Sequence, residues 1–311
     1  MTTSGTLNKQ SFWGKVFTSL GLLLLCINGF FPLLWMILTS FKPESELIRT
    51  PLTYLPASPT IENYLEVFRS LPFHRFLWNS AVVSISATLL CVLFAALAGY
   101  ALGRLNLPGR RFILTLIVMT SMFPAIVLLV PLYRLFLGGL EVPILGSIVS
   151  FLHDVGLFFL PERIISPNLL NTYPALIIPY IALSLPIATL ILTSFFQLIP
   201  KDLESAALVD GTSKVGALFR IIAPLSAPGI VTAAIIVFVN SWNEFLLAVT
   251  FNTTLSMRTV PVGITLYQGE YAFPWHVISA AITLGMIPLL VLILVFQKRI
   301  ISGLAAGGVK G

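Results

Sequence analysis

The sequence contains very little charge. Only 10% of its 311 residues are Asp, Glu, Lys or Arg, whereas 57% are hydrophobic and the mean hydropathy is +0.97. Soluble domains contain about 25% charged residues, so this chain cannot cover a globule of its size with polar surface. A soluble fold is therefore excluded, and we expect an integral membrane protein with the lipid bilayer as its solvent.

Cysteine and histidine are also scarce, with two and three residues. Cys26 and Cys91 each lie inside an apolar segment, where we interpret them as small packing residues and not as a disulfide or as ligands. His74, His153 and His276 are far apart in the sequence and show no metal-ligand spacing. The sequence therefore predicts no metal site.

Two further absences exclude functional classes. The phosphate-binding pattern G-x-x-x-x-G-K-[ST] is missing, since Gly14-Lys15 is followed by Val16 and lacks the upstream glycine, so we expect no ATP bound by that route. The net charge of +6 comes from scattered basic residues, which suit membrane lipid and topology signals better than nucleic acid. No acid, base, nucleophile and metal ligands cluster together, so we do not expect an enzyme.

Uncharged runs long enough to cross a bilayer need about 20 residues. We expect an all-α fold with six transmembrane helices, at about residues 16–39, 76–102, 112–133, 174–198, 225–249 and 277–297. The apolar but Gly-rich stretch 135–160 is interpreted as an external loop with short interfacial helices and not as a seventh span. The membrane domain then spans 16–297, between tails at 1–15 and 298–311.

The basic residues predict the orientation of these helices. With six spans and a cytoplasmic N-terminus, the short cytoplasmic pieces collect eleven Lys and Arg residues, which satisfies the positive-inside rule. They are Lys9, Lys15, Arg104, Arg110, Arg111, Lys201, Lys214, Arg220, Lys298, Arg299 and Lys310. Arg104, Arg110 and Arg111 are interpreted as topology anchors, and both termini are expected in the cytoplasm.

A polar island, Lys201 to Pro224, separates two of the apolar segments. It contains six of the chain's 30 charged residues, and its acids at 202 and 204 suit the N-terminus of a short helix over 202–209. Gly211 follows as a natural C-terminal cap. We expect a second short helix from Ser213 toward Ile222 that stops at Pro224. Such a segment indicates that another protein docks there.

The island resembles a known motif. Glu-Ser-Ala-Ala-Leu-Val-Asp-Gly at 204–211, with Ile221 and Pro224 further on, is similar to the EAA loop of ABC importer permeases. In that family this loop is the coupling helix, which occupies a groove of the ATPase subunit. Ser205 and Ala223 depart from the pattern, which has Glu and Leu there. The residues that the resemblance assigns to ATPase coupling are Leu203, Glu204, Ala206, Ala207, Asp210, Gly211, Ile221 and Pro224.

Other motifs narrow the resemblance to carbohydrate-uptake permeases of the maltose type, the smaller six-helix kind. They are Ser40-Phe41-Lys42-Pro43, Asn79-Ser80, Trp242-Asn243-Glu244-Phe245, Thr259-Val260-Pro261-Val262-Gly263, Gln297-Lys298-Arg299 and the C-terminal stretch 303–311. The resemblance covers nearly the whole chain, although the loop at about 138–168 is longer than is usual. It also implies that Gly307, Gly308 and Lys310 form a flexible tail that contacts the ATPase subunits.

The resemblance implies a function and a set of partners. The chain would be a permease subunit with the type I ABC importer fold in the inner membrane of a bacterium or archaeon, importing a mono-, di- or oligosaccharide. It would pair with a second homologous permease, two ATPase subunits that bind ATP and Mg²⁺, and an extracytoplasmic sugar-binding protein. The chain itself would bind no cofactor. The alternative within the same machinery is another solute, such as glycerol phosphate or a compatible solute.

A further alternative is an ion-coupled secondary transporter, which predicts paired charges within the membrane and repeated halves. Only Glu244 is embedded in an apolar helix, and no repeat is evident. A membrane-embedded carboxylate is a functional candidate; it equally suits packing, with a hydrogen bond to Asn243 or Asn240. Together with Trp242, these three residues form a candidate substrate path, because aromatic faces stack on sugars and amides bind hydroxyls.

Overall fold

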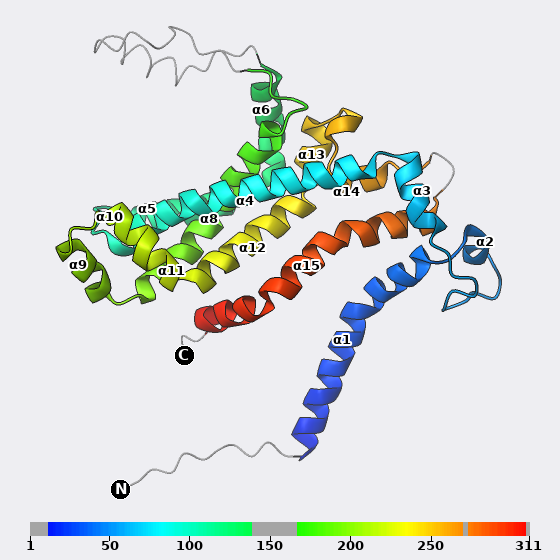
Figure 1. Ribbon diagram of the computed structural model, residues 1–311, viewed down its shortest axis with the longest axis horizontal. Coiled ribbons are helices and arrows are strands. Elements are labelled where there is room, and N and C mark those ends of the chain that lie inside the picture. Colours follow the sequence, from blue (N-terminus) through cyan, green and yellow to red (C-terminus); the bar gives the residue numbers. More distant parts are fainter. Residues whose placement is uncertain (1–11, 139–166, 270–272, 309–311) are drawn as a thin grey trace. The chain divides into compact units, whose positions relative to one another are not determined.

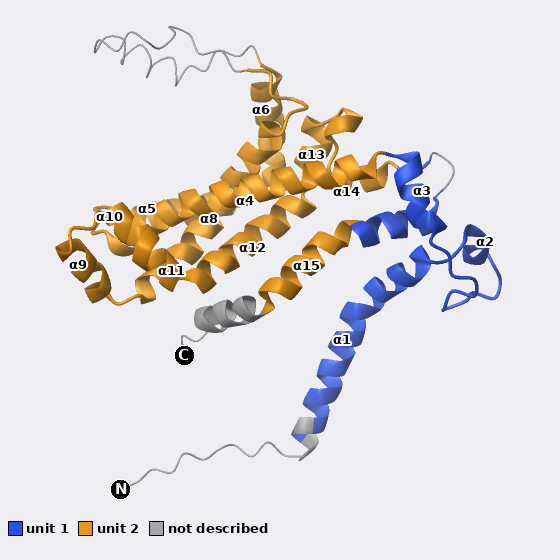
Figure 2. Ribbon diagram, in the orientation of Figure 1, with its two compact units in different colours: residues 1–71, 267–284 blue, residues 72–266, 285–311 orange. Residues whose placement is uncertain are grey.

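A computed structural model of the protein describes residues 12–138, 167–269 and 273–308 (Figure 1). These residues form helices joined by turns and loops and contain no β-strand, so the all-α prediction is confirmed. The chain divides into two compact units, 1–71 with 267–284 and 72–266 with 285–311 (Figure 2). Each unit is described by itself.

The first unit contains three helices and the beginning of a fourth. They are α1 (Phe12–Ser40), α2 (Glu44–Leu47), α3 (Glu62–Ser70) and the first part of α15 (Trp275–Gly308). The Asn63 side chain donates hydrogen bonds of 2.8 Å to the carbonyl oxygens of Ser40 and Lys42. The Tyr267 hydroxyl donates to the Val67 carbonyl at 2.6 Å. These bonds hold the polar turns of the unit together.

The second unit carries the remaining helices. They are α4 (Phe73–Arg104), α5 (Arg110–Ser121), α6 (Ala125–Leu137), α8 (Pro174–Leu198), α9 (Lys201–Val209), α10 (Lys214–Ala217), the π-helical turn η1 (Leu218–Ile222), α11 (Ala223–Leu225), α12 (Ala227–Asn243), α13 (Leu246–Phe251), the 3₁₀ turn η2 (Leu255–Met257) and α14 (Val260–Thr265). Figure 1 shows α4, α8 and α12 running alongside one another.

Small residues allow the central helices to approach closely. The core between α4, α8 and α12 contains Cys91, Ala95, Ala188 and Ala233, all fully buried. At Gly99 an added Cβ would lie only 3.1 Å from the Thr193 backbone nitrogen. Such small-residue contacts are typical of membrane helices, where packing and not the hydrophobic effect holds helices together.

The third expected helix, 112–133, is not a single helix. α5 ends at Ser121, α6 begins at Ala125, and their axes are bent by 88°. Pro124 precedes α6 in an extended conformation. Proline lacks an N–H and disfavours a helical residue before it, which explains the break. The expected loop beyond α6 falls on residues 139–166, which lie outside the described part of the chain.

The fifth and sixth expected helices also have different bounds. The range 225–249 is interrupted twice: the chain bends by 86° at Ser226, and α12 ends at Asn243 before the short α13. The last helix was expected to end at 297, but α15 continues to Gly308. By contrast, α8 occupies the expected range 174–198 and begins with Pro174, a position that suits proline.

Four described helical segments are long and apolar enough to span a membrane. They are Val16–Ser40, Phe73–Arg104, Pro174–Leu198 and Trp275–Gln297. Two bent helix pairs, 110–137 and 214–243, raise the number to six if each pair is one span. The chain is therefore a multi-pass membrane protein.

Candidate functional site

The polar island forms two short helices around a glycine turn. α9 ends where the Asp210 N–H donates to the Ala206 carbonyl at 3.0 Å and the Gly211 N–H donates to the Leu208 carbonyl at 3.1 Å. Gly211 has a φ of +84°, in the left-handed region that costs an L-residue about 1–2 kcal/mol. This position therefore requires glycine for its backbone and not for space, because nothing lies within 4 Å of an added Cβ.

The sequence predicted that the second helix of the island stops at Pro224, but the helical segment continues beyond this residue. Ser213 caps α10 by accepting the Gly216 N–H at 3.1 Å, and the helix then widens into the π-turn η1. The Ala223 N–H donates to the Leu218 carbonyl, five residues earlier. Pro224 lies inside the following turn, α11, and the chain bends only at Ser226. Proline has no N–H to donate and its ring crowds the carbonyl four residues earlier, and here the wider π-turn directly precedes the turn that contains it.

The residues assigned to coupling point in different directions. Ala207 is buried against its own chain, whereas Ala206, Asp210, Gly211 and Pro224 are exposed and Ile221 is half-buried. Five large apolar side chains of the island are exposed, namely Leu203, Leu208, Val209, Val215 and Phe219. Val209 is 87% exposed. On α9 the exposed Leu203, Leu208 and Val209 therefore stand beside the charged Lys201 and Asp202.

Glu204 turns inward. Its Oε2 lies 2.7 Å from the Nε of Arg104, and its Oε1 accepts the Tyr100 hydroxyl. Arg104 also donates to the backbone carbonyls of Ile199 and Pro200. The Arg104 side chain is 1% exposed and that of Glu204 12%. Arg104 was interpreted as a topology anchor; the structure shows instead a buried cation that joins α4 to the beginning of α9.

Glu244 occupies the break between α12 and α13. Its carboxylate accepts the N–H groups of Leu247 at 2.8 Å and Ala248 at 3.1 Å, and the Tyr180 hydroxyl at 2.6 Å. Neither Asn243 nor Asn240, the partners expected from the sequence, bonds to it. The carboxylate satisfies the free N–H groups at the start of α13, so its contacts fit the packing interpretation.

The other members of the candidate substrate path are separated. Trp242 is buried, stacks on Phe238 with ring centroids 5.6 Å apart, and donates its Nε1–H to the Gly285 carbonyl at 3.2 Å. Asn240 and Asn243 are exposed. The indole of Trp242 therefore packs between helices. A substrate role for Asn240, Trp242, Asn243 and Glu244 stays a prediction. Gly307 and Gly308 lie in the last turn of α15 and not in an irregular tail, and Lys310 lies outside the described residues.

Two motifs far apart in the sequence meet at the beginning of α4. The Asn79 amide donates to the carbonyls of Ser256 and Arg258, each at 2.9 Å, and the Ser80 hydroxyl accepts the Val260 N–H at 2.8 Å. Asn79 Oδ1 in turn accepts the Tyr173 hydroxyl at 3.0 Å. Asn79-Ser80 and the segment 259–263 thus form one hydrogen-bonded junction, a contact that sequence spacing could not reveal.

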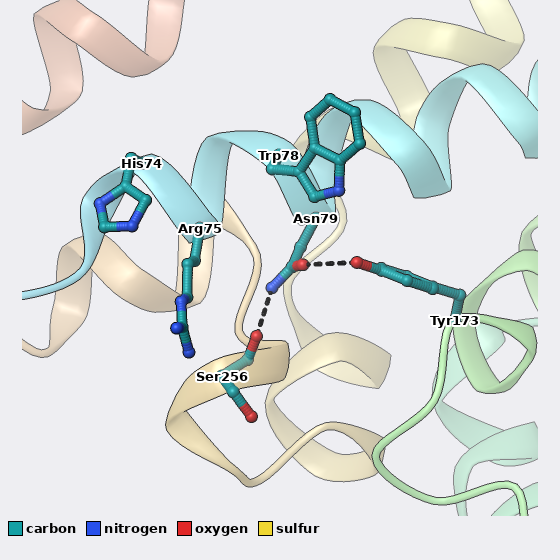
Figure 3. A pocket seen from close by; sticks show the side chains of 6 residues that line it. All are labelled: His74, Arg75, Trp78, Asn79, Tyr173 and Ser256. Atoms are coloured by element: carbon teal, nitrogen blue, oxygen red, sulfur yellow. Dashed lines mark hydrogen bonds between the residues drawn. The ribbon is translucent and has the colours of Figure 1, made fainter.

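A cavity of about 510 Å³ opens at this junction (Figure 3). Its lining residues are His74, Arg75, Trp78, Asn79, Tyr173 and Ser256. In Figure 3, Asn79 lies between Tyr173 and Ser256, while His74, Arg75 and Trp78 project from the first turns of α4. Sequence analysis did not single out these three residues, because a lone Arg, His or Trp at a helix end carries no spacing signal. Among the described residues, no group of three or more His, Cys, Asp or Glu side chains is placed to hold a metal ion.

The long apolar helices, the polar island and the junction at the opposite end of α4 define a helical membrane transport subunit. The chain matches the family described as "Binding-protein-dependent transport system inner membrane component" over residues 92–305. It belongs to this family, and the resemblance stated from the sequence is confirmed.

Proteins similar to this chain are permeases. The sulfoquinovosyl glycerol transport system permease protein SmoH of Agrobacterium fabrum is 47% identical over 300 residues, which cover 96% of this chain and 95% of that protein. The trehalose/maltose transport system permease protein MalG of Thermococcus litoralis is 36% identical, covering 96% and 97%. A bacterial ABC transporter that imports the acidic polysaccharide alginate has the same fold, with a TM-score of 0.71 at 18% identity, covering 93% of this chain and 98% of that one.

Proposed function

We propose that this chain is the permease subunit of an ATP-driven ABC importer that moves a sugar across the cytoplasmic membrane. The family itself depends on a binding protein, and the relatives named above serve sugar transport systems, which supports a carbohydrate as the solute. The complex would contain a second, homologous permease, two ATPase subunits that bind ATP and Mg²⁺, and an extracytoplasmic sugar-binding protein.

The observation that carries the proposal is the exposure of apolar side chains on the island 201–224. Exposed Leu203 and Val209 lie on α9 among charged residues, outside the helices and bent pairs that are apolar enough to span a membrane, and need a protein partner to cover them. An ATPase subunit with an apolar groove fits that description. Closure of two ATPase subunits would then press on α9 and reorient the helices. A path between the two permease subunits would thereby open alternately to each side of the membrane.

The charge distribution supports an orientation. The island carries Lys201, Lys214 and Arg220, and Arg110 and Arg111 follow the end of α4 that contacts it. The positive-inside rule places such a face in the cytoplasm. In this orientation both termini are cytoplasmic, and the cavity at the beginning of α4 faces outward.

Copurification and uptake test the proposal together. Val209→Glu should release the ATPase subunits from the purified complex and abolish ATP-dependent sugar uptake in proteoliposomes that contain the binding protein. Ile48→Glu is the matched control, because Ile48 is 81% exposed but lies in the other compact unit, beside α2. It should retain the ATPase subunits. Normal ATPase binding and uptake in the Val209 variant would contradict the coupling role, and failure of the wild-type complex to import any sugar would contradict the proposed solute.

A further inference from the structure

The cavity lined by His74, Arg75 and Trp78 lies at the opposite end of α4 from the ion pair of Arg104 with Glu204. Asn79 and Arg104 are 25 positions apart in one uninterrupted helix. At 1.5 Å per residue this corresponds to about 38 Å, which exceeds the thickness of the hydrocarbon core of a bilayer. The cavity and the coupling segment therefore lie on opposite sides of the membrane.

The floor of this cavity is already occupied by internal hydrogen bonds. The Asn79 amide uses both of its ends, toward Ser256 and Arg258 on one side and toward the Tyr173 hydroxyl on the other. These groups make the junction rigid, and they are not free to hold a ligand. The rim is different, because it consists of side chains whose polar groups have no partner among the described residues.

Arg75 gives the rim its charge. Its side chain is exposed, forms no ion pair with any described residue and presents a guanidinium group toward the cavity side of α4 (Figure 3). None of the six lining residues is acidic, and His74 adds a second nitrogen donor or acceptor beside Arg75. Both residues lie in the first turn of a 32-residue helix, where the helix dipole also favours negative charge. An anionic group therefore fits this rim, and a cation does not.

Trp78 lines the same cavity and supplies a flat apolar face. It is 66% exposed, and together with His74 it also lines a neighbouring apolar cavity of about 420 Å³. The two cavities thus share His74 and Trp78, and the lining of the second is almost entirely apolar. A tryptophan that served only as an interfacial membrane anchor would need no such cavity beside it. A sugar has both surfaces, since its C–H face stacks on aromatic rings and its substituents bind polar groups.

We propose that this cavity is an outward-facing binding site for a sugar that carries an anionic group, a carboxylate, sulfonate or phosphate. Arg75 forms the charge-assisted hydrogen bonds to the anion, and Trp78 packs against the sugar ring. This inference rests on the proposed function, import of a sugar, and specifies the chemical class of that sugar.

Equilibrium binding to the complete permease–ATPase complex in lipid nanodiscs tests the site. Labelled glucuronate and glucose are suitable probes, because they differ by a carboxylate in place of a hydroxymethyl group. The wild type should bind glucuronate at least tenfold more tightly than glucose. Arg75→Gln should weaken glucuronate binding about tenfold or more and change glucose binding less than twofold, whereas Trp78→Ala should weaken both.

Matched controls come from the same chain. Arg134 on α6 is exposed and forms no ion pair with a described residue, and Trp275 is 58% exposed. Arg134→Gln and Trp275→Ala should leave both probes unaffected. Equal binding of the two probes by the wild type, or an Arg75→Gln variant that behaves like Arg134→Gln, would overturn the proposal and leave Arg75 and Trp78 as membrane anchors only.

Measuring the uptake of neutral and anionic sugars distinguishes a failure of this inference from a failure of the proposed function. If the wild-type complex imports neutral sugars but shows no preference for glucuronate, the anionic site is wrong and sugar import stands. If Arg75-dependent glucuronate binding is found while no sugar of either charge is imported, the anion site stands and the proposed solute is wrong.

Discussion

Arg104 and Glu204 form an ion pair, with the Nε of Arg104 2.7 Å from Oε2 of Glu204, between the last turn of α4 and the first turn of α9. The guanidinium also binds the carbonyls of Ile199 and Pro200, so the beginning of α9 is attached to α4 at three points. α9 therefore cannot tilt without moving the end of α4 or breaking these bonds. Since α4 continues without interruption to the cavity at its other end, the ion pair is a mechanical link between the two regions.

Glu204→Gln should destabilise the protein and impair coupling. The substitution leaves the buried Arg104 guanidinium without its counter-charge, and breaking a buried pair in this way costs about 3–5 kcal/mol. We expect a lower melting temperature of the purified complex and a loss of sugar uptake per ATP hydrolysed. The measurement compares thermal unfolding and the uptake-to-ATPase ratio with those of the wild type.

Asp202→Asn is the matched control for this variant, because Asp202 is an exposed acid in the same turn of α9. It should change stability by less than about 0.5 kcal/mol. A Glu204→Gln protein as stable and as tightly coupled as Asp202→Asn would show that the ion pair contributes neither to folding nor to transmission.

Three substitutions of Gly211 should have graded effects. The residue has a φ of +84° and open space around an added Cβ, so only backbone strain decides the outcome. Asn tolerates this conformation, Ala should cost about 1 kcal/mol, and Pro cannot adopt it and also removes the N–H that bonds to Leu208. Uptake should follow the order Gly, Asn, Ala, Pro, with none left in the last. Equal uptake by the Ala and Pro variants would show that the turn at 211 does not position the coupling helix.

The end of the first helix of the island could be predicted from the sequence, but the inner contacts of the island could not. Charge pattern, helix-forming alanines and a glycine stop are local signals, and α9 indeed ends just before Gly211. The pairing of Glu204 with Arg104 joins residues 100 positions apart, and no periodicity encodes it. The same limit applies to the junction of Asn79 with 256–260, whose motifs were noticed separately but not as partners.

The breaks within the apolar runs are the second feature that could not be predicted from the sequence. Hydropathy alone describes 112–133 and 225–249 as continuous, because both ranges are predominantly apolar. Pro124 was visible in the sequence, yet Pro179 inside α8 is an equally visible proline that leaves its helix whole. Whether a proline breaks a membrane helix depends on which neighbours satisfy the freed carbonyls, and that is a tertiary property.

Acid should weaken the turn after α1 through Glu46. Hydrogen bonds donated by the Thr53 hydroxyl and the Ala57 N–H hold the pKa of this carboxyl below its ordinary value of 4.5, and Lys42 contributes a smaller electrostatic effect. The folded-state pKa is thus lower than the unfolded one. The stabilisation is complete above pH 4.5 and is lost as the pH falls through the folded-state pKa. The melting temperature, or protection of residues 42–57 from proteolysis, should decrease over that range.

Glu46→Gln should remove this part of the pH dependence and lower stability at neutral pH. Glu62→Gln is the control, because Glu62 is an exposed acid of the same unit whose ion pair with Arg69 lies on the surface. It should retain the wild-type response to acid. If the wild type and the Glu46 variant lost stability in parallel between pH 6 and 3, the bonds from Thr53 and Ala57 would not stabilise the turn.

Gly263→Ala should destabilise the junction at the beginning of α4 by about 1–3 kcal/mol, the usual cost of overpacking. An added Cβ would lie 2.2 Å from Cδ2 of Phe76, whose ring is fully buried. Phe76→Leu in the same protein should recover part of the loss, because the smaller side chain vacates that space. Gly29→Ala, inside α1 and with no atom within 4 Å of its Cβ, is the control and should not destabilise the protein. Thermal unfolding of the wild type, Gly263→Ala, Phe76→Leu and the double variant measures the coupling between positions 76 and 263, and additive effects would show that the glycine is not required for the close approach of α14 to α4.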